Sequence, residues 1–317
     1  MKINQDNTKY INVVGSPCSG TGAIFDYLYG RGDLYDPLFG EEYLLPSLPN
    51  GLLNLLATIE KASDPSITEY SLKKFKYLTN YLMKYWSSKK NNEKLNSNIK
   101  IFEIAVEQFI KDITYIDYPM RLLSQELSKS FVENTISKFR RKIGVSASNP
   151  QTRLTVSKTN FLEAVHKLHN SMFNTNAENK KIILNRGCSI WCLKESSKFF
   201  LDGKIVVVNR DPRDQFVELK SYKQAHSVDG FVDWYRESRN RLDLINDSNI
   251  LFINFEDFVI KNDKYKKILC DHISINEITS TYDPELSKKN VGKFINNLDK
   301  NEILKIEKNL NEYIYFD

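Results

Sequence analysis

The first fifty residues contain a short apolar run, a glycine-rich turn and an apolar pattern with helical spacing. Tyr10–Val14 is rich in β-branched residues, which indicates a buried strand. The turn Gly15–Gly22 follows directly, and apolar residues within Ala23–Leu28 recur at the spacing of a helix. Gly30 and Gly32 mark the expected end of that helix. The sequence therefore predicts a strand, a glycine-rich turn and a helix in this order.

From about residue 52 to about residue 170 the apolar positions keep helical spacing, as they do in Leu72–Leu82. The polar segment Ser87–Asn98 is expected to form a loop. Arg140–Lys142 is interpreted as a solvated helix face, and a site for an anionic acceptor is the alternative. The region shows no internal repeat. It predicts packed helices that form a cap or insertion on an α/β core.

The second half alternates between strand and helix patterns. Strands are predicted at Lys181–Leu184, Lys204–Val208 and Ile250–Phe255. Helices are predicted at Trp191–Phe200, Phe231–Leu244, Tyr265–Cys270 and Lys300–Tyr313. Such alternation favours a parallel sheet covered by helices on both faces. The expected fold is α/β, with a P-loop-type parallel sheet, flanking helices and the helical insertion, all within one domain of residues 1–317.

Composition narrows the class of protein. Of 317 residues, 41% are hydrophobic and 27% charged, which is an ordinary globular balance, and a net charge of +5 does not indicate a nucleic-acid binder. The N-terminal residues lack a secretory pattern, and no apolar run reaches the length of about 20 residues that spans a bilayer. The spacing of Cys18, Cys188, Cys192 and Cys270 fits neither a zinc site nor a disulfide scaffold. We therefore expect reduced thiols, a cytoplasmic location and no metal.

The glycine-rich turn has the features of an anion site. A turn between a strand and a helix presents backbone N–H groups at the positive end of the helix, which suits a phosphate. Gly20 and Gly22 allow close backbone approach, and Ser19 and Thr21 add hydroxyl groups. Thr21-Gly22 stands where a Walker A loop needs Lys-Ser/Thr, which disfavours ATP or GTP hydrolysis. A tight turn without a ligand is the alternative.

A second basic segment follows the strand predicted at Lys204–Val208. Arg210 and Arg213 come directly after it, where ligands of open α/β sheets gather. The planar donor fork of arginine suits a phosphate. The alternative is a structural network in which Asp211 and Asp214 pair with the arginines.

Taken together, these segments resemble the sulfotransferase family that uses phosphoadenosyl phosphosulfate (PAPS). Pro17–Gly22 resembles the 5′-phosphosulfate loop, Pro-Lys/Arg-Ser-Gly-Thr-Thr, and Val206–Asp214 resembles the 3′-phosphate strand and loop. Asn254–Phe258 is similar to the family's Tyr-Glu-Asp-Leu segment, and Ser287–Phe294 to its C-terminal Gly-Lys/Arg loop. Phe231–Tyr235 is similar to a helix of bacterial members that sulfate surface glycans.

The resemblance implies a donor site for PAPS. It implies that Cys18 and Ser19–Gly22 surround the 5′-phosphosulfate and that Arg210 binds the 3′-phosphate. The family has a serine eight residues beyond that arginine, where this chain has Glu218. Ser221 or a lysine of the C-terminal loop, which contains Lys288, Lys289 and Lys293, could replace the serine, and the resemblance implies that Gly292 of the same loop also lies at the nucleotide.

Cys18 is a second departure, because the family has Lys or Arg there to stabilise charge on the leaving oxygen. A single electrostatic contact of this kind is worth on the order of 10²–10³ in rate. We expect Lys293 or Lys289 to reach the leaving group instead. The alternative is a catalytically weakened homologue that still binds PAPS. An ATP-dependent P-loop phosphotransferase also remains an alternative.

The resemblance also implies a carboxylate base and an acceptor. Glycan-sulfating relatives carry a glutamate about twenty residues past the phosphate loop, where this chain has Glu41 and Glu42. The pattern Glu-x-Tyr-Leu-Leu favours Glu41. Adjacent carboxylates on an extended segment point opposite ways, so one of the two faces the acceptor. A solvated acidic loop is the alternative. The expected acceptor is a hydroxyl or amine of a bacterial glycan or glycolipid, while its identity and the oligomeric state stay open.

Overall fold

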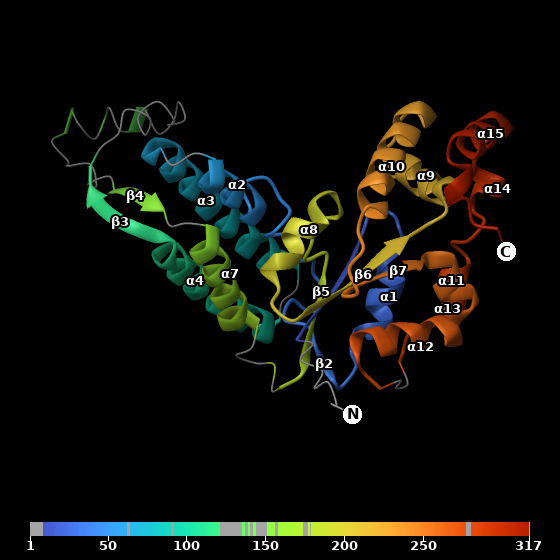
Figure 1. Ribbon diagram of the computed structural model, residues 1–317, viewed down its shortest axis with the longest axis horizontal. Helices are drawn as coiled ribbons and strands as arrows, with labels where there is room; N and C mark the ends of the chain where they lie inside the picture. The colour runs from blue at the N-terminus through green and yellow to red at the C-terminus, as the bar shows by residue number, and fades with distance from the viewer. Residues whose placement is uncertain are drawn as a thin grey trace. The chain divides into compact units, whose positions relative to one another are not determined.

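The computed structural model describes residues 9–61, 64–89, 92–120, 135–136, 139, 142–143, 151–155, 158–173, 177, 179–276 and 280–316. Arg140 and Arg141 lie outside them. The chain divides into two compact units (Figure 1). The first contains Met1–Tyr43 and Asn176–Asp317, and the second contains Leu44–Thr175. That the whole chain forms one domain stays a prediction.

A parallel sheet forms the centre of the first unit. Its strands are β1 (Tyr10–Gly15), β2 (Leu34–Tyr35), β5 (Lys181–Asn185), β6 (Gly203–Asn209) and β7 (Ile250–Asn254). Five strands lie in the order β2-β5-β1-β6-β7, and every pairing is parallel. The chain fills one side of β1 before the other, so the carboxyl end of β1 is a switch point where ligands of such sheets bind. The predicted α/β class is confirmed.

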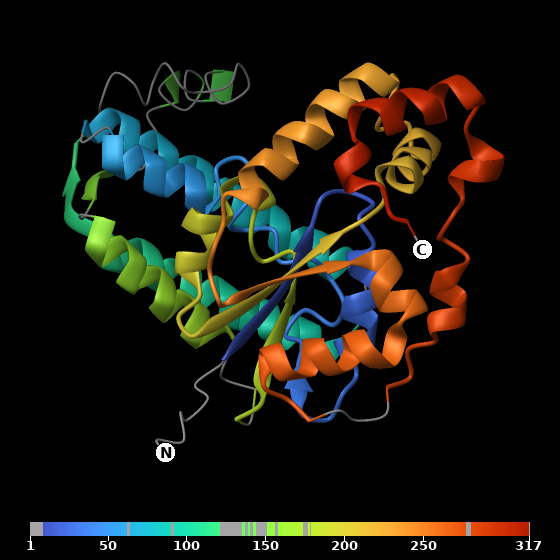
Figure 2. The same cartoon turned by 45° about the vertical axis from the view of Figure 1, so that its right-hand side comes forward.

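Helices surround this sheet (Figure 2). Their bounds are α1 (Thr21–Leu28), α8 (Leu193–Ser196), α9 (Pro212–Ser221), α10 (Val228–Asp243), α11 (Phe255–Ile260), α12 (Asn262–Ile273), α13 (Pro284–Lys288), α14 (Phe294–Asn297) and α15 (Lys300–Asn309). Single 3-10 turns occupy Ile190–Cys192, Ser197–Phe199 and Asn311–Tyr313. The helix predicted at Trp191–Phe200 is thus divided into short turns. Helices α9 and α11 were not predicted and begin shortly after the strands β6 and β7.

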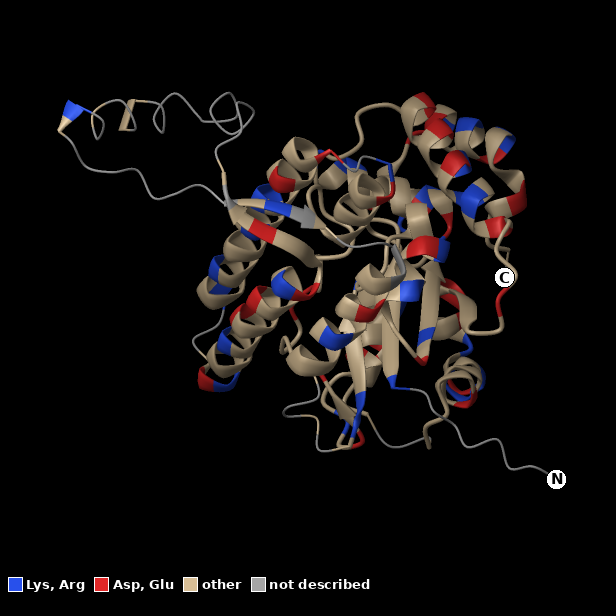
Figure 3. Ribbon diagram, turned by 60° about the vertical axis from the view of Figure 1, so that its left-hand side comes forward, with Lys and Arg blue, Asp and Glu red and all other residues tan. Residues whose placement is uncertain are grey.

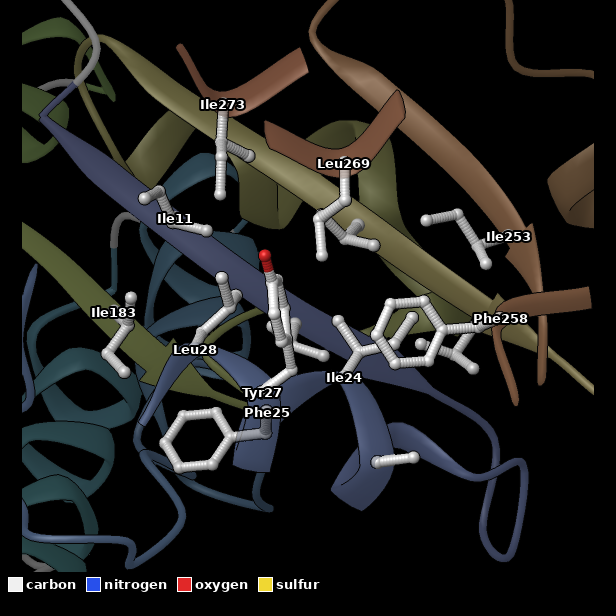
Figure 4. Packing of buried hydrophobic residues seen from close by; sticks show 14 of the residues in the cluster. Ile11, Ile24, Phe25, Tyr27, Leu28, Ile183, Ile253, Phe258, Leu269 and Ile273 are labelled. Atoms are coloured by element: carbon white, nitrogen blue, oxygen red, sulfur yellow. The ribbon is translucent and has the colours of Figure 1, made fainter. Parts of the chain in front are cut away.

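Both faces of β1 are buried, and the burial includes one polar residue, Asn12. Figure 4 shows Ile11 packed with Ile24 and Leu28 of α1 and Leu269 of α12. On the opposite face, the ring of Tyr10 lies edge-on to that of Phe200, with centroids 5.7 Å apart. A separate core joins α9, α10 and α15. These contacts hold the carboxyl ends of β1 and β6 in fixed positions.

The second unit contains helices and a strand pair. The helices are α2 (Leu52–Lys61), α3 (Pro65–Lys89), α4 (Glu93–Asp112) and α7 (Lys158–Phe173), and the antiparallel pair is β3 (Thr114–Pro119) with β4 (Gln151–Thr155). The helical expectation missed the strand pair, although the aromatic and β-branched residues of β3 suit a strand.

The loop predicted at Ser87–Asn98 is wrong over most of its length. Helix α3 continues to Lys89, and α4 begins at Glu93. The side chain of Asn92 accepts hydrogen bonds from the backbone N–H groups of Lys94 and Leu95, which caps α4. Polarity alone misled the prediction, because Lys and Glu are good helix formers.

The described helices include none that is both long and apolar enough to cross a membrane. Lys and Arg are interspersed with Asp and Glu over the helices of both units (Figure 3).

Candidate phosphate-binding site

The turn after β1 is built around backbone conformations that require small residues. Cys18 and Gly20 are both left-handed, with φ of 62° and 88°. A Cβ added at Gly20 would lie 2.4 Å from Cδ2 of Phe255, so α11 packs directly on the turn. A Cβ at Gly15 would lie 2.1 Å from Oγ of Ser19. The turn therefore folds tightly back on itself at the carboxyl end of β1.

The start of α1 offers donors to an anion. Gly20 caps the helix without a side-chain hydrogen bond; the N–H of Ala23 donates to the carbonyl oxygen of Gly20 at 3.1 Å, which leaves the N–H groups of Thr21 and Gly22 to face an anion. A Cβ at Gly22 would meet no atom within 4 Å, so the backbone there is open to close approach. Ser19 is fully buried, and its Oγ has no hydrogen-bond partner among the described residues. A buried hydroxyl without a partner is uncommon and indicates a ligand group or water beside it.

Arg210 extends from the end of β6 toward this turn. Its side chain is 1% exposed. Nη1 donates to the carbonyl oxygen of Cys18 at 3.0 Å, and Nη2 donates to that of Asn290 at 2.7 Å. The guanidinium also lies 5.0 Å from the ring centre of Phe255. Its Nε is buried without a hydrogen-bond partner in the part of the chain that the structure describes. Arg210 thus links the turn to the C-terminal segment, and its binding of a 3′-phosphate stays a prediction.

Glu218 lies between two predicted cations. Its Oε2 is 3.0 Å from Nη1 of Arg210, and its Oε1 is 3.3 Å from Nζ of Lys293. Burial raises the pKa of the Cys18 thiol, Glu218 raises it further, and Arg210 and Arg186 act in the opposite direction. Cys18 is consequently a neutral thiol near neutral pH and supplies no charge to the turn.

The second arginine of the segment, Arg213, pairs with acidic side chains of the protein itself. Arg213 donates to the carboxylate of Asp211 at 2.7 Å and to Glu307 at 2.6 Å. Asp214 accepts from the backbone N–H groups of Gly292 at 2.7 Å and Phe294 at 2.9 Å. The alternative of an internal network therefore holds for Arg213, while Arg210 faces the turn.

The predicted residues of the C-terminal loop also differ in whether they contact the cluster of Arg210 and Glu218. Lys293 reaches Glu218, whereas Lys288 forms an ion pair with Glu285 at 2.5 Å and Lys289 is exposed. Gly292 is left-handed, with φ of 74°, and lets the loop return to α9. Ser221 is exposed and donates to the backbone oxygen of Glu218 at 2.8 Å. Of these residues, Lys293 is the one that forms an ion pair with Glu218, the partner of Arg210.

Glu42 lies at the carboxyl end of β5 and forms a parallel bridge with Asn185. One of its carboxylate oxygens is 3.1 Å from Nη1 of Arg186. Arg186 follows β5 directly, and its backbone N–H donates to the carbonyl oxygen of Val13 at 2.9 Å. The Glu42 carboxylate is therefore held by Arg186 at the carboxyl end of β5.

Arg186 is the residue that the sequence reasoning missed. It stands directly after an apolar strand, as Arg210 does, so the same rule applied to Lys181–Asn185 would have found it. The positive charge of Arg186 acts to lower the pKa of the Cys18 thiol. The side chain is 38% exposed, which leaves it accessible to a ligand at the turn.

An apolar groove of about 470 Å³ adjoins the turn at Pro17. Leu219 of α9 and Phe231 and Trp234 of α10 form its wall, and His226 lies at its edge. The rings of Phe231 and Trp234 are tilted, with centroids 6.1 Å apart. The groove offers a ring-sized surface beside the anion site.

Among the residues that the structure describes, no group of three or more His, Cys, Asp or Glu side chains has the arrangement of a metal site.

Comparison with known proteins gives limited information. No family model and no curated protein matches the chain, while eight chains of solved structures do. One is the sulfotransferase domain from the Synechococcus PCC 7002 olefin synthase, with a TM-score of 0.44, 15% identity and coverage of 97% of both chains. Another is the sulfotransferase domain from the curacin biosynthetic pathway, with a TM-score of 0.44, 13% identity and coverage of 97% of this chain and 99% of that chain. Likeness of this degree does not identify a function, which is therefore argued from the chain's own residues.

Proposed function

We propose that the protein is a sulfotransferase that moves a sulfuryl group from PAPS to a hydroxyl or amine of a bacterial carbohydrate. The observation that carries the proposal is the buried Ser19 hydroxyl without a partner at the start of α1, together with Arg210, which donates to the same turn from the end of β6. A nucleotide with phosphate groups on two separate carbons fits an anion site at a helix start and a second one at an arginine. Thr21-Gly22 in place of Lys-Ser/Thr disfavours magnesium-ATP.

Donor binding divides between two clusters in this proposal. Ser19 and the N–H groups of Thr21 and Gly22 bind the 5′-phosphosulfate. Arg210 and Lys293 bind the 3′-phosphate, and Glu218 partly neutralises both cations. The two cations match a phosphate dianion better than they match one carboxylate, because phosphate offers more acceptor oxygens.

The transfer step needs stabilisation of the leaving oxygen and removal of the acceptor proton. The acceptor oxygen or nitrogen forms a bond to sulfur as the bond from sulfur to the phosphate oxygen breaks. We assign Arg186 to the leaving oxygen in place of a cation at Cys18, because Arg186 lies at the end of the neighbouring strand. We assign Glu42 to the acceptor proton, since Arg186 holds its carboxylate at this edge of the sheet. The groove beside Pro17 is the proposed acceptor surface.

Titration calorimetry with 3′,5′-ADP, the desulfonated nucleotide, tests the donor assignment. Micromolar binding is expected for wild type, with magnesium-ATP at least about tenfold weaker. Arg210→Ala and Lys293→Ala should lose affinity, whereas Arg241→Ala, an exposed arginine paired with Glu237, should not. Preference for magnesium-ATP, or equal affinity in all variants, contradicts the proposal.

A PAPS-binding homologue with little turnover is the second candidate, favoured by the neutral thiol at Cys18. Radiolabelled sulfate transfer from PAPS to a panel of glycans separates the two. Nucleotide binding without transfer to glycan or water supports the second candidate.

A further inference from the structure

Helix α3 of the second unit carries tyrosines along its exposed side. The tyrosine face is defined here as Tyr70, Tyr77, Tyr81 and Tyr85. Tyr70 is 44% exposed, Tyr77 74% and Tyr81 56%. At the helical rotation per residue the four fall within an arc of about 80° and extend over about 22 Å. The buried residues of α3 lie on the opposite side: Thr68, Leu72, Phe75, Thr79, Leu82 and Trp86.

The tyrosine face is also basic. Helix α3 contains five lysines and a single acidic residue, Glu69. Glu69 is turned away from the tyrosines, since its carboxylate accepts from the backbone N–H of Arg153 at 3.1 Å. Nζ of Lys74 lies 5.2 Å from the ring centre of Tyr70, and Nζ of Lys89 lies 4.9 Å from that of Tyr85. Lys76 pairs with Glu107 of α4, with Nζ and Oε1 2.6 Å apart, so the cations that lie beside the aromatic rings are Lys74 and Lys89.

The rings are partly ordered by contacts with one another. Tyr81 and Tyr85 are stacked, with centroids 6.4 Å apart and planes 19° from parallel. The cation–ring pairs restrict Tyr70 and Tyr85 further. Ordered rings on a rigid helix bind with a smaller loss of conformational freedom than flexible side chains.

We infer that the tyrosine face of α3 binds an extended anionic polysaccharide, which under the proposed function is the acceptor chain. A phenol offers a flat face for the C–H groups of a sugar ring and a hydroxyl for the sugar's own hydroxyls. Lys74 and Lys84 match carboxylates along such a chain. A lipid surface fits less well, because the face offers four phenol hydroxyls and a single aliphatic residue, Ile67. The role as acceptor surface rests on the proposed function; the binding itself does not.

Affinity electrophoresis and calorimetry of the whole chain test the inference, with alginate and hyaluronan as anionic probes and dextran as the neutral one. Wild type should bind at least one anionic glycan more tightly than dextran, with affinity falling as salt rises. The double variant Tyr77→Ala/Tyr81→Ala should weaken binding about tenfold or more. Tyr115→Ala is the matched control, since Tyr115 is 75% exposed on β3 of the same unit. Lys74→Gln/Lys84→Gln should remove the preference for anionic glycans.

The outcomes separate the inference from the proposed function. Glycan binding that is equal in wild type and the tyrosine variant overturns the inference, as does binding to vesicles of anionic phospholipid with none to glycans. If the variant loses glycan binding while wild type fails to bind 3′,5′-ADP, the inference stands and the sulfotransferase proposal falls. If both bind, the variant should raise KM for long acceptors while kcat and nucleotide affinity stay unchanged.

Discussion

Glu218 is the residue at which this chain departs most visibly from a simple phosphate site. Its carboxylate contacts both Arg210 and Lys293. An anionic ligand at these cations has to displace or share that carboxylate, which lowers its affinity. The family that the sequence resembles has serine at this position, and a serine would leave both cations to the ligand.

We predict that Glu218→Ser increases affinity for 3′,5′-ADP about tenfold, because a competing charge is removed from two partly buried cations. Calorimetric titration measures the change, and Glu237→Ser on α10 is the control for loss of a surface carboxylate. Unchanged or weaker binding in Glu218→Ser would mean that the 3′-phosphate does not lie at this cluster.

Arg186 is the other residue whose role is open to a direct test. We predict that Arg186→Ala lowers kcat by a factor on the order of 10²–10³ while nucleotide affinity changes little, since its charge acts on the leaving oxygen. Cys18→Lys in the Arg186→Ala background should recover part of kcat, because it returns a cation to the turn. A variant whose kcat stays at the wild-type level removes Arg186 from the mechanism.

Residues of the candidate site could be predicted from the sequence when they belong to a short continuous motif. The turn 15–22 and Arg210 were found because each directly follows an apolar strand. The pairing of Glu42 with Arg186 could not be found this way, since the two are 144 positions apart and meet only through the sheet. The sequence favours Glu41 over Glu42 as the base, and that choice stays a prediction beside the pairing of Glu42 with Arg186.

At the scale of elements, the turn between β1 and α1 has one glycine, Gly20, that packs against the protein and another, Gly22, that is open to a ligand. We predict opposite effects for two glycine substitutions in it. Gly20→Ala should lower stability by about 1–3 kcal/mol, because its φ of 88° and the ring of Phe255 both exclude a side chain. Gly22→Ala should keep wild-type stability and lose nucleotide affinity, because its Cβ enters the space open to the anion. Denaturant unfolding and titration of both variants check this, and loss of stability in Gly22→Ala contradicts it.

Strands were predicted better than the short helices around them. The short runs rich in Ile and Val at β1, β5, β6 and β7 stand out in the sequence, whereas β2, with two residues, was not predicted. Helix α11 was missed because its six residues are too few to show periodicity. Helix α9 was missed because its buried residues include Arg213, Asp214 and Gln215, which break the apolar pattern. The pair β3–β4 depends on residues far apart in the chain, which a local pattern does not reveal.

At the scale of the whole molecule, the buried carboxyl of Glu256, at the start of α11, makes the stability of the fold depend on pH. The side chain is 1% exposed. Its Oε1 accepts from the backbone N–H of Asp211 at 2.9 Å, while Oε2 is buried without a partner among the described residues. Burial raises the pKa of this carboxyl to about 7, against an ordinary value of 4.5. Between about pH 4.5 and pH 7, the Glu256 carboxyl therefore holds its proton in the folded chain and has lost it in the unfolded chain.

The sign of the resulting pH dependence follows from this difference. Because the folded pKa exceeds the unfolded one, the contribution of Glu256 to stability is complete below about pH 4.5 and is lost as pH rises through 7. We predict that Glu256→Gln gains stability relative to wild type by about 3 kcal/mol between pH 5 and pH 8. Urea unfolding at both pH values measures the change, and Glu237→Gln, on an exposed surface ion pair, should show none. A difference between Glu256→Gln and wild type that is the same at both pH values would mean that Glu256 is ionised in the folded protein, and that Arg210 rather than burial governs its charge.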